Sequence, residues 1–167
     1  MKAGFEQDKM KDACGVFAIH APDKDVARLA YFALFSLQHR GQESAGIAVY
    51  SDKEIVCYKN MGLVTLVFDE KILRLLKGKM AVGHVRYSTT GSSNEVNAQP
   101  ILAGSDTIRH SKSCGAKYRR QVAVAHNGNL VNTATLREEL QEQGVEFETS
   151  SDTEVIAEMI AMSDKPT

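Results

Sequence analysis

The sequence predicts an α+β domain in which antiparallel sheets are covered by helices. Short apolar segments bounded by turn residues follow one another closely, and helical segments are interleaved with them. The strict alternation of strand and helix that marks a parallel sheet is absent. The chain has 167 residues, of which 43% are hydrophobic and 25% charged, so it is long enough for one domain with a sizeable core.

The first half of the chain predicts four strands and two helices. Apolar runs between turn residues predict strands over residues 15–20, 45–50, 54–59 and 80–85. Apolar residues at helical spacing from Val26 predict a helix that ends near residue 40, with Gly41 as its C-terminal cap. Asp69 is suited to cap a short helix that stops before Gly78.

The second half begins with a polar loop over residues 86–100, followed by a basic and polar stretch over 104–120. Apolar segments predict strands over 101–103, over 121–126 and around Phe147. Two helices are predicted, one from Asn132 or Thr133 to Gly144 and one that follows the capping residues 150–152.

Composition excludes several classes of protein. A net charge of −1 gives no reason to expect a nucleic-acid partner, and no apolar run approaches the ~20 residues of a membrane span. Residues 1–13 form a polar leader without an apolar signal core, which argues against secretion. The three cysteines and five histidines show no metal-ligand spacing, so no metal is expected and a reducing cytoplasm is the natural location. Residues 14–167 are expected to form the single domain.

Cys14 opens the first predicted strand, and two interpretations of it compete. A lone cysteine at a strand edge is most often a small buried hydrophobic residue. Alternatively, Cys14 is a nucleophile whose base is its own α-amine, which exists only after residues 1–13 have been cut away.

Polar residues at three strand or helix ends could surround such a nucleophile. The planar fork of Arg86 suits a carboxylate, and Asp152 at a helix start suits an ammonium group. The pair Asn127-Gly128 can offer a side-chain amide and a backbone amide to one oxygen, which is what an oxyanion hole requires. Together with a thiol, these groups would fit an amide-bearing amino acid.

Each of these groups also has a simpler interpretation. Asn-Gly is most often a turn, Asp152 an ordinary helix cap with Ser150 or Ser151 as rival, and Arg86 half of a surface ion pair. Cys57 lies inside a predicted strand and is expected in the core.

Six longer motifs add to this argument. They lie at residues 14–17, 37–46, 83–91, 97–100, 125–132 and 151–154, and include Gln-His-Arg-Gly-Gln-Glu-Ser-Ala-Gly at 38–46 and Arg-Tyr-Ser-Thr-Thr-Gly at 86–91. In content and order they resemble the glutamine amidotransferase domain of the amidophosphoribosyltransferase family, whose nucleophile is an N-terminal cysteine. The resemblance implies a four-layer αββα sandwich of two antiparallel sheets, the fold of the N-terminal nucleophile (Ntn) hydrolases.

The resemblance also implies roles for ten residues. Cys14 would attack the side-chain amide of L-glutamine, and Asn127 with Gly128 would form the oxyanion hole. Arg86 would bind the substrate carboxylate and Asp152 its α-amine. The remaining residues would close over glutamine, lie near it or orient the nucleophile: Tyr87, Thr89, Gln99, Arg40 and Gly41.

Finally, the resemblance implies a wider context. Ammonia released from glutamine would serve phosphoribosylamine formation in purine biosynthesis, on a phosphoribosyltransferase domain that is expected in the full-length family and absent from this chain. The family's magnesium, and the iron–sulfur cluster of some members, would lie outside this chain, and a homo-oligomer is compatible with the resemblance. The alternative is a catalytically silent module that binds glutamine or a partner, with its leader uncut.

Overall fold

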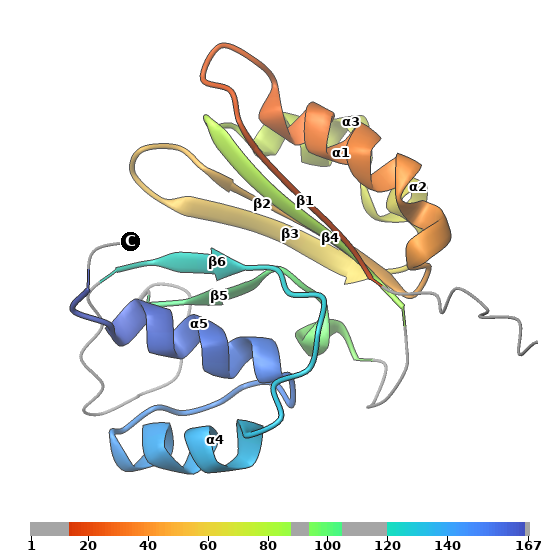
Figure 1. The fold of residues 1–167 in the computed structure, drawn as a ribbon. Coiled ribbons are helices and arrows are strands. Elements are labelled where there is room, and N and C mark those ends of the chain that lie inside the picture. The colour runs from red at the N-terminus through yellow and green to blue at the C-terminus, as the bar shows by residue number, and fades with distance from the viewer. Residues whose placement is uncertain (1–13, 88–93, 105–119, 166–167) are drawn as a thin grey trace, which may run out of the picture.

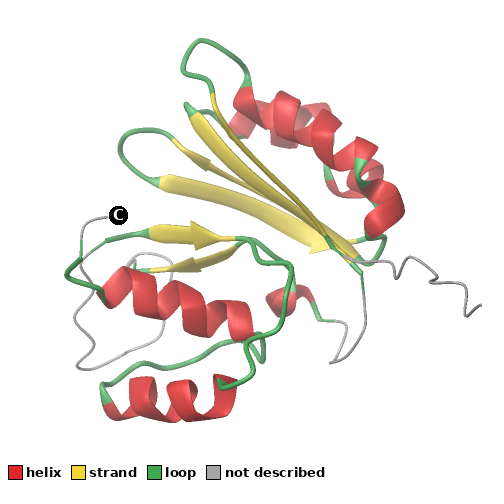
Figure 2. Ribbon diagram, in the orientation of Figure 1, coloured by secondary structure: helices red, strands yellow, loops and turns green. Residues whose placement is uncertain are grey.

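Two antiparallel sheets stacked between helices form the protein (Figure 1). The computed structural model describes residues 14–87, 94–104 and 120–165. Helices α1 (Val26–Ser36), α2 (Val64–Val67) and α3 (Glu70–Leu75) cover the outer face of the larger sheet, and α4 (Thr133–Glu142) and α5 (Asp152–Met162) lie beyond the smaller one (Figures 1 and 2). This arrangement confirms the predicted αββα sandwich.

The larger sheet has four strands in the order β1-β4-β2-β3. Their bounds are Gly15–His20 for β1, Ser44–Tyr50 for β2, Ile55–Met61 for β3 and Met80–Arg86 for β4. All three pairings are antiparallel, and the register places Gly15 opposite Val85 and Ser44 opposite Arg86. The ends of β1 and β4 that carry Cys14 and Arg86 therefore meet at one edge of the sandwich.

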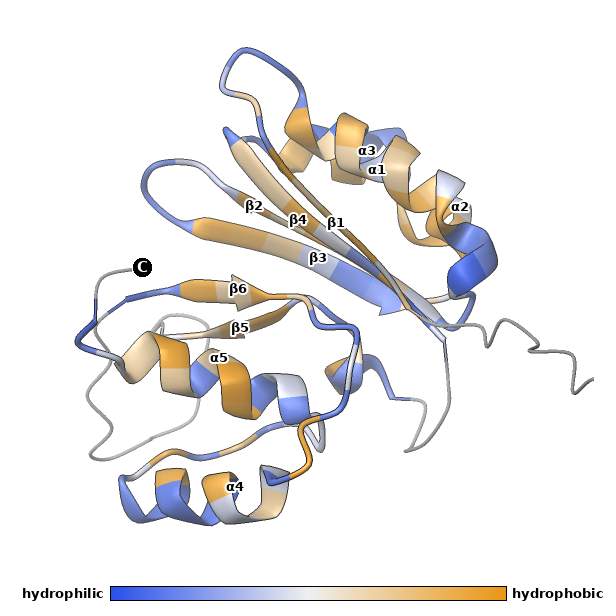
Figure 3. Ribbon diagram, in the orientation of Figure 1, coloured by the Kyte–Doolittle hydropathy of each residue, from blue (hydrophilic) through white to orange (hydrophobic). Residues whose placement is uncertain are grey.

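The main core fills the space between this sheet and α1, α2 and α3. Because side chains alternate between the two faces of a strand, Ala45, Ile47 and Val49 of β2 all point to the helices and are fully buried. Leu34 of α1 and Val85 of β4 belong to the same cluster. Figure 3 gives much of α1 and of the strands in this sheet apolar colours, whereas the connecting turns and the end of β3 are polar.

The smaller sheet consists of β5 (Ile101–Ala103) and β6 (Val122–Val124), paired antiparallel. Ile101 and Ala103 pack against Ala157 and Ala161 of α5, whose small side chains allow the helix to lie close to the sheet. A third cluster joins α4 to α5.

Polar contacts and one glycine join the two sheets. The ammonium group of Lys59 on β3 donates to the carbonyl oxygens of Ala98 and Pro100, which precede β5. The backbone amide of Ile55 donates to the side chain of Gln121 at 2.9 Å. A Cβ on Gly46 would lie 2.1 Å from the Gln99 carbonyl oxygen, so only glycine permits this approach of β2 to the segment before β5.

One predicted strand is absent from the described residues. The expected strand at Phe147 is irregular chain, because the amides of Glu148 and Thr149 donate to the carboxylate of Glu154 at 2.9 and 2.8 Å instead of to a neighbouring strand. The helical segment from Val26 ends as α1 followed by a 3₁₀ helix, η1 (Gln38–Arg40), and Gly41 is the C-cap of η1, as predicted. Its amide donates to the Gln38 carbonyl oxygen at 3.2 Å, although its backbone is extended and not left-handed. Helix α2 and a second 3₁₀ helix, η2 (Glu95–Asn97), were not predicted.

No helix in the described part of the chain is long and apolar enough to cross a membrane.

Candidate active site

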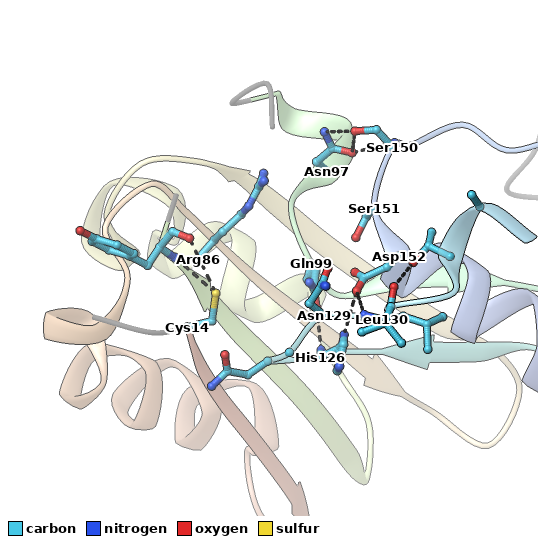
Figure 4. A pocket seen from close by; sticks show the side chains of 16 residues that line it. Cys14, Arg86, Asn97, Gln99, His126, Asn129, Leu130, Ser150, Ser151 and Asp152 are labelled. Atoms are coloured by element: carbon cyan, nitrogen blue, oxygen red, sulfur yellow. Dashed lines mark hydrogen bonds and ion pairs between the residues drawn. The ribbon is translucent and has the colours of Figure 1, made fainter. Parts of the chain in front are cut away.

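A cavity of about 750 Å³ opens where the two sheets meet at the Cys14 edge of the sandwich. It gathers residues from the ends of β1 and β4, the segment before β5, the loop after β6 and the starts of α4 and α5. Its lining residues are Cys14, Arg86, Tyr87, Asn97, Gln99, His126, Asn127, Gly128, Asn129, Leu130, Val131, Thr133, Ala134, Ser150, Ser151 and Asp152. Figure 4 shows the side chains that line this cavity.

Cys14 is partly buried, and both its side chain and its backbone make hydrogen bonds. The backbone amide of Tyr87 donates to Sγ at 3.5 Å, and the thiol faces the carbonyl oxygen of Tyr87 at 3.9 Å. The guanidinium Nε of Arg40 donates to the Cys14 carbonyl oxygen at 3.3 Å.

Arg86, the last residue of β4, projects between Cys14 and Asn97 in Figure 4. Its side chain is only 14% exposed and its Nε lies 3.8 Å from Oε2 of Glu43, whose side chain is 12% exposed. The interpretation of Arg86 as half of a surface ion pair is therefore wrong. Gly41 packs directly on the Arg86 backbone, because a Cβ at residue 41 would lie 2.5 Å from the Arg86 carbonyl carbon.

The Asn127-Gly128 loop follows β6 and is anchored at His126. The His126 amide donates to Oε1 of Gln99 at 2.6 Å. The imidazole of His126 lies beneath the loop, since a Cβ on Gly128 would be 2.6 Å from its Nε2. Asn127 and Gly128 are exposed residues and line the cavity.

Asp152 is the first residue of α5, and Ser151 is the N-cap through its hydroxyl, which accepts from the Thr153 amide at 3.2 Å. The interpretation of Asp152 as the helix cap is thus wrong, because Ser151 is the cap. Asp152 Oδ2 instead accepts the Leu130 amide at 2.7 Å and lies 3.9 Å from Nδ1 of His126. The helix dipole and this amide stabilise a negative charge at the cavity wall.

Three residues in or beside the site were given no role from the sequence: Asn97, Glu43 and His126. Asn97 of η2 contacts Ser150 twice, donating from Nδ2 to its hydroxyl at 3.1 Å and accepting its amide at 3.1 Å. This link ties the segment before β5 to the start of α5. Glu43 and His126 lay inside recognisable motifs, but only the fold shows that they contact Arg86 and the Asn127-Gly128 loop.

The structure brings Cys14, Arg86, Asn127, Gly128 and Asp152 to one cavity. Tyr87 and Gln99 also line it, although Gln99 uses its side-chain oxygen on His126, while Arg40 and Gly41 lie behind Cys14 and Arg86. Thr89 lies outside the described residues, as do the leader and most of the 104–120 stretch.

Cys57 lies on β3, away from this cavity, and burial raises the pKa of its thiol to about 11. A thiol with so high a pKa is almost entirely protonated at neutral pH and is a poor nucleophile. Among the described residues, no group of three or more His, Cys, Asp or Glu side chains is arranged to hold a metal ion.

The glutamine amidotransferase domain family matches residues 84–165. Over that range, about half of its length, the chain is similar to glutamine amidotransferase domains. It is 53% identical to an amidophosphoribosyltransferase of Synechococcus elongatus over 155 residues, and 53% identical to one of Archaeoglobus fulgidus over 149 residues. These alignments cover 92% and 89% of this chain but 29% and 30% of the relatives.

Solved structures agree in fold as well as sequence. The structure described as the allosteric regulatory enzyme of purine biosynthesis superposes with a TM-score of 0.73 at 43% identity. A glutamine phosphoribosylpyrophosphate amidotransferase from B. subtilis gives 0.70 at 41% identity. Each match covers 91% of this chain and 30% of the other, and places the domain in the Ntn-hydrolase fold. The chain spans about three tenths of the length of these relatives.

Proposed function

We propose that this domain hydrolyses the side-chain amide of L-glutamine through a thioester on Cys14. The observation that carries the proposal is the single cavity that joins a thiol, a guanidinium, two oxyanion donors and a carboxylate. Glutamine carries one complementary group for each of them: an amide carbon, an α-carboxylate, an amide oxygen and an α-ammonium.

Two charged side chains, Arg86 and Asp152, would recognise the charged groups of glutamine. Nη1 of Arg86 is buried and has no hydrogen-bond partner among the described residues, so an incoming carboxylate would satisfy it. Asp152 also lines the cavity, and its Oδ1 accepts a long contact from the Thr153 hydroxyl at 3.5 Å, so this oxygen could bind an ammonium group. The two charges would therefore hold the amino-acid end of glutamine and leave its amide for Cys14.

The chemistry requires that the Ala13–Cys14 bond be cut, because the proposed base is the α-amine of Cys14. That amine takes the thiol proton, and the thiolate adds to the amide carbon while Asn127 and Gly128 bind the oxyanion. The ammonium returns its proton to the leaving nitrogen and ammonia departs, leaving the γ-glutamyl thioester. Water, deprotonated by the same amine, then hydrolyses the thioester to glutamate and the free thiol.

The wider role proposed is that of the relatives. The ammonia would be used for phosphoribosylamine formation in purine biosynthesis, on a transferase domain such as the longer relatives contain. What supports this is the identity of about half of the aligned residues to amidophosphoribosyltransferases.

The test combines intact mass with glutamate release from glutamine. The 167-residue chain is expressed alongside Cys14→Ala and Cys57→Ala variants. We expect loss of residues 1–13 and glutaminase activity in the wild type and in Cys57→Ala, and no activity in Cys14→Ala. A version in which Met directly precedes Cys14 separates a failure of cleavage from a failure of chemistry.

Turnover that persists in Cys14→Ala would refute the thioester mechanism. Glutamine binding by a chain that has a free Cys14 amine but no turnover would instead support the silent glutamine-binding module.

A further inference from the structure

Glu43 is a nearly buried carboxylate at the edge of the proposed glutamine site that the mechanism does not use. It lies immediately before β2, and its backbone is fixed between two strands: its amide donates to the Arg86 carbonyl oxygen at 3.0 Å, and its carbonyl oxygen accepts the Gly62 amide at 2.7 Å. The position of its side chain is thus set by the sheet.

The environment of this carboxylate is unusual. Both oxygens of Glu43 are buried and have no hydrogen-bond partner among the described residues. A buried charge is costly unless it is paired, and the charged group facing Glu43 is the guanidinium of Arg86, 3.8 Å from Oε2. At that separation the interaction is electrostatic and not a hydrogen bond.

The nitrogens of the Arg86 guanidinium lie in different environments. Nε faces Glu43, whereas Nη1 is buried without a partner and Arg86 as a whole lines the cavity. An arginine side chain has several rotatable bonds and would otherwise sample many rotamers. A fixed negative charge beside Nε restricts those rotamers and leaves the terminal nitrogens for a ligand.

We infer that Glu43 is the positioning residue for Arg86: its carboxylate holds the guanidinium so that the terminal nitrogens meet the α-carboxylate of the substrate. The inference rests on the proposed function, because it assumes that Arg86 binds that carboxylate. Glu43 itself would not touch glutamine.

The central experiment measures binding and turnover separately in Glu43→Gln, which keeps the shape of the side chain and removes its charge. We expect KM for glutamine to rise roughly tenfold or more while kcat stays within about threefold, since a misplaced anchor weakens substrate positioning. Titration calorimetry of glutamine in a Cys14→Ala background should show the same loss of affinity without any chemistry.

A substrate without the α-carboxylate distinguishes positioning from general damage. 4-Aminobutanamide keeps the amide and the amine of glutamine but offers nothing to Arg86. Its kcat/KM should therefore be unchanged in Glu43→Gln, within about twofold, if Glu43 acts only through the carboxylate anchor. Equal losses for glutamine and 4-aminobutanamide would overturn the inference.

Three further variants complete the design. Glu43→Asp keeps the charge and should recover much of the lost affinity. Combining Glu43→Gln with Arg86→Lys should cost little more than Arg86→Lys alone, because both changes disable the same anchor. Glu142→Gln, an exposed glutamate on α4, is the matched control and should behave as wild type.

Thermal unfolding of every variant guards against a folding defect. If the wild type turns over glutamine and Glu43→Gln binds it equally well, the inference is wrong while the proposed function stands. If the wild type neither binds nor hydrolyses glutamine, the proposed function fails first.

Discussion

His84 lies fully buried on β4, two residues before Arg86 and on the same inner face of the sheet. Burial lowers the pKa of its imidazole from the ordinary value of 6.5 to about 4, and the positive charge of Arg86 acts in the same direction. The backbone of His126 opposes the shift without reversing it. His84 is therefore neutral in the folded protein at neutral pH.

This shift predicts an acid-sensitive fold. The unfolded chain takes up the His84 proton near pH 6.5, whereas the folded chain does so only near pH 4, so stability is full above pH 6.5 and falls as the pH drops toward 4. The loss should reach roughly 3 kcal/mol, which urea unfolding between pH 7.5 and 4 would measure. His84→Gln should flatten this acid limb, and the exposed control His39→Gln should not. An unchanged limb in His84→Gln would show that other groups cause the acid sensitivity.

Some site residues could be predicted from the sequence and others could not. Arg86, Asn127 and Asp152 follow predicted strands or begin a predicted helix, so their approach to Cys14 could be anticipated from local pattern and resemblance. The role of Gln99 could not, because its bond to the His126 amide joins two segments far apart in sequence. Glu43 gave no local signal, since its burial results from the pairing of β2 with β4.

At the scale of elements, the contact between β2 and the segment before β5 depends on Gly46. The backbone of Gln99 lies against this glycine, and the side chain of Gln99 accepts the His126 amide at the start of the Asn127-Gly128 loop. A strand of the larger sheet thereby supports a loop that follows the smaller one.

Gly46→Ala should disturb both the packing and the loop. The added Cβ would lie 2.1 Å from a backbone oxygen, so the Gln99 segment must move. We expect the free energy of unfolding to fall by about 1–3 kcal/mol, as for other overpacked interiors, together with a loss of kcat for glutamine. Ala48→Gly, two residues along the same strand, should lower stability without a comparable loss of kcat. Normal activity in Gly46→Ala would mean that the loop does not depend on this contact.

The predictability of elements follows the strength of local pattern. β1 was predicted with the correct bounds because an apolar run stands between polar segments, and Asp69 does cap α3 by accepting the Ile72 amide. The single turn of α2 is too short to show a helical period. The Phe147 segment resembled a strand because Val145 and Phe147 alternate, yet both pack against the α4–α5 cluster.

At the scale of the whole molecule, the described apolar clusters lie within the two helix–sheet halves and between α4 and α5. Between the sheets, Lys59 and Ile55 of the larger sheet donate hydrogen bonds to the segments that flank the smaller one. Burial lowers the pKa of Lys59, because it disfavours the charged form of the ammonium group. The two halves are thus joined by polar contacts at positions that the sequence alone did not single out.

Lys59→Met should therefore weaken the junction more than either half. The substitution keeps an unbranched side chain but leaves the carbonyl oxygens of Ala98 and Pro100 without their donor, a cost of about 1–3 kcal/mol. Hydrogen exchange should show faster exchange in β5 and β6 while the amides of β2 and β4 change little. Lys77→Met, at an exposed position, is the control. Uniformly faster exchange throughout would indicate one cooperative core instead.

Chain ends usually fray, so the first residue of a chain is in general a poor place for a group that must be held accurately. The fixation of Cys14 removes this difficulty. Arg40 holds its carbonyl oxygen, β1 begins at the next residue and pairs with β4, and the Tyr87 amide faces its sulfur. All of these attachments lie on the C-terminal side of the Ala13–Cys14 bond or on the side chain. Cutting that bond would free the α-amine of Cys14 and leave these contacts intact. The new N-terminus would therefore already be held in the sheet.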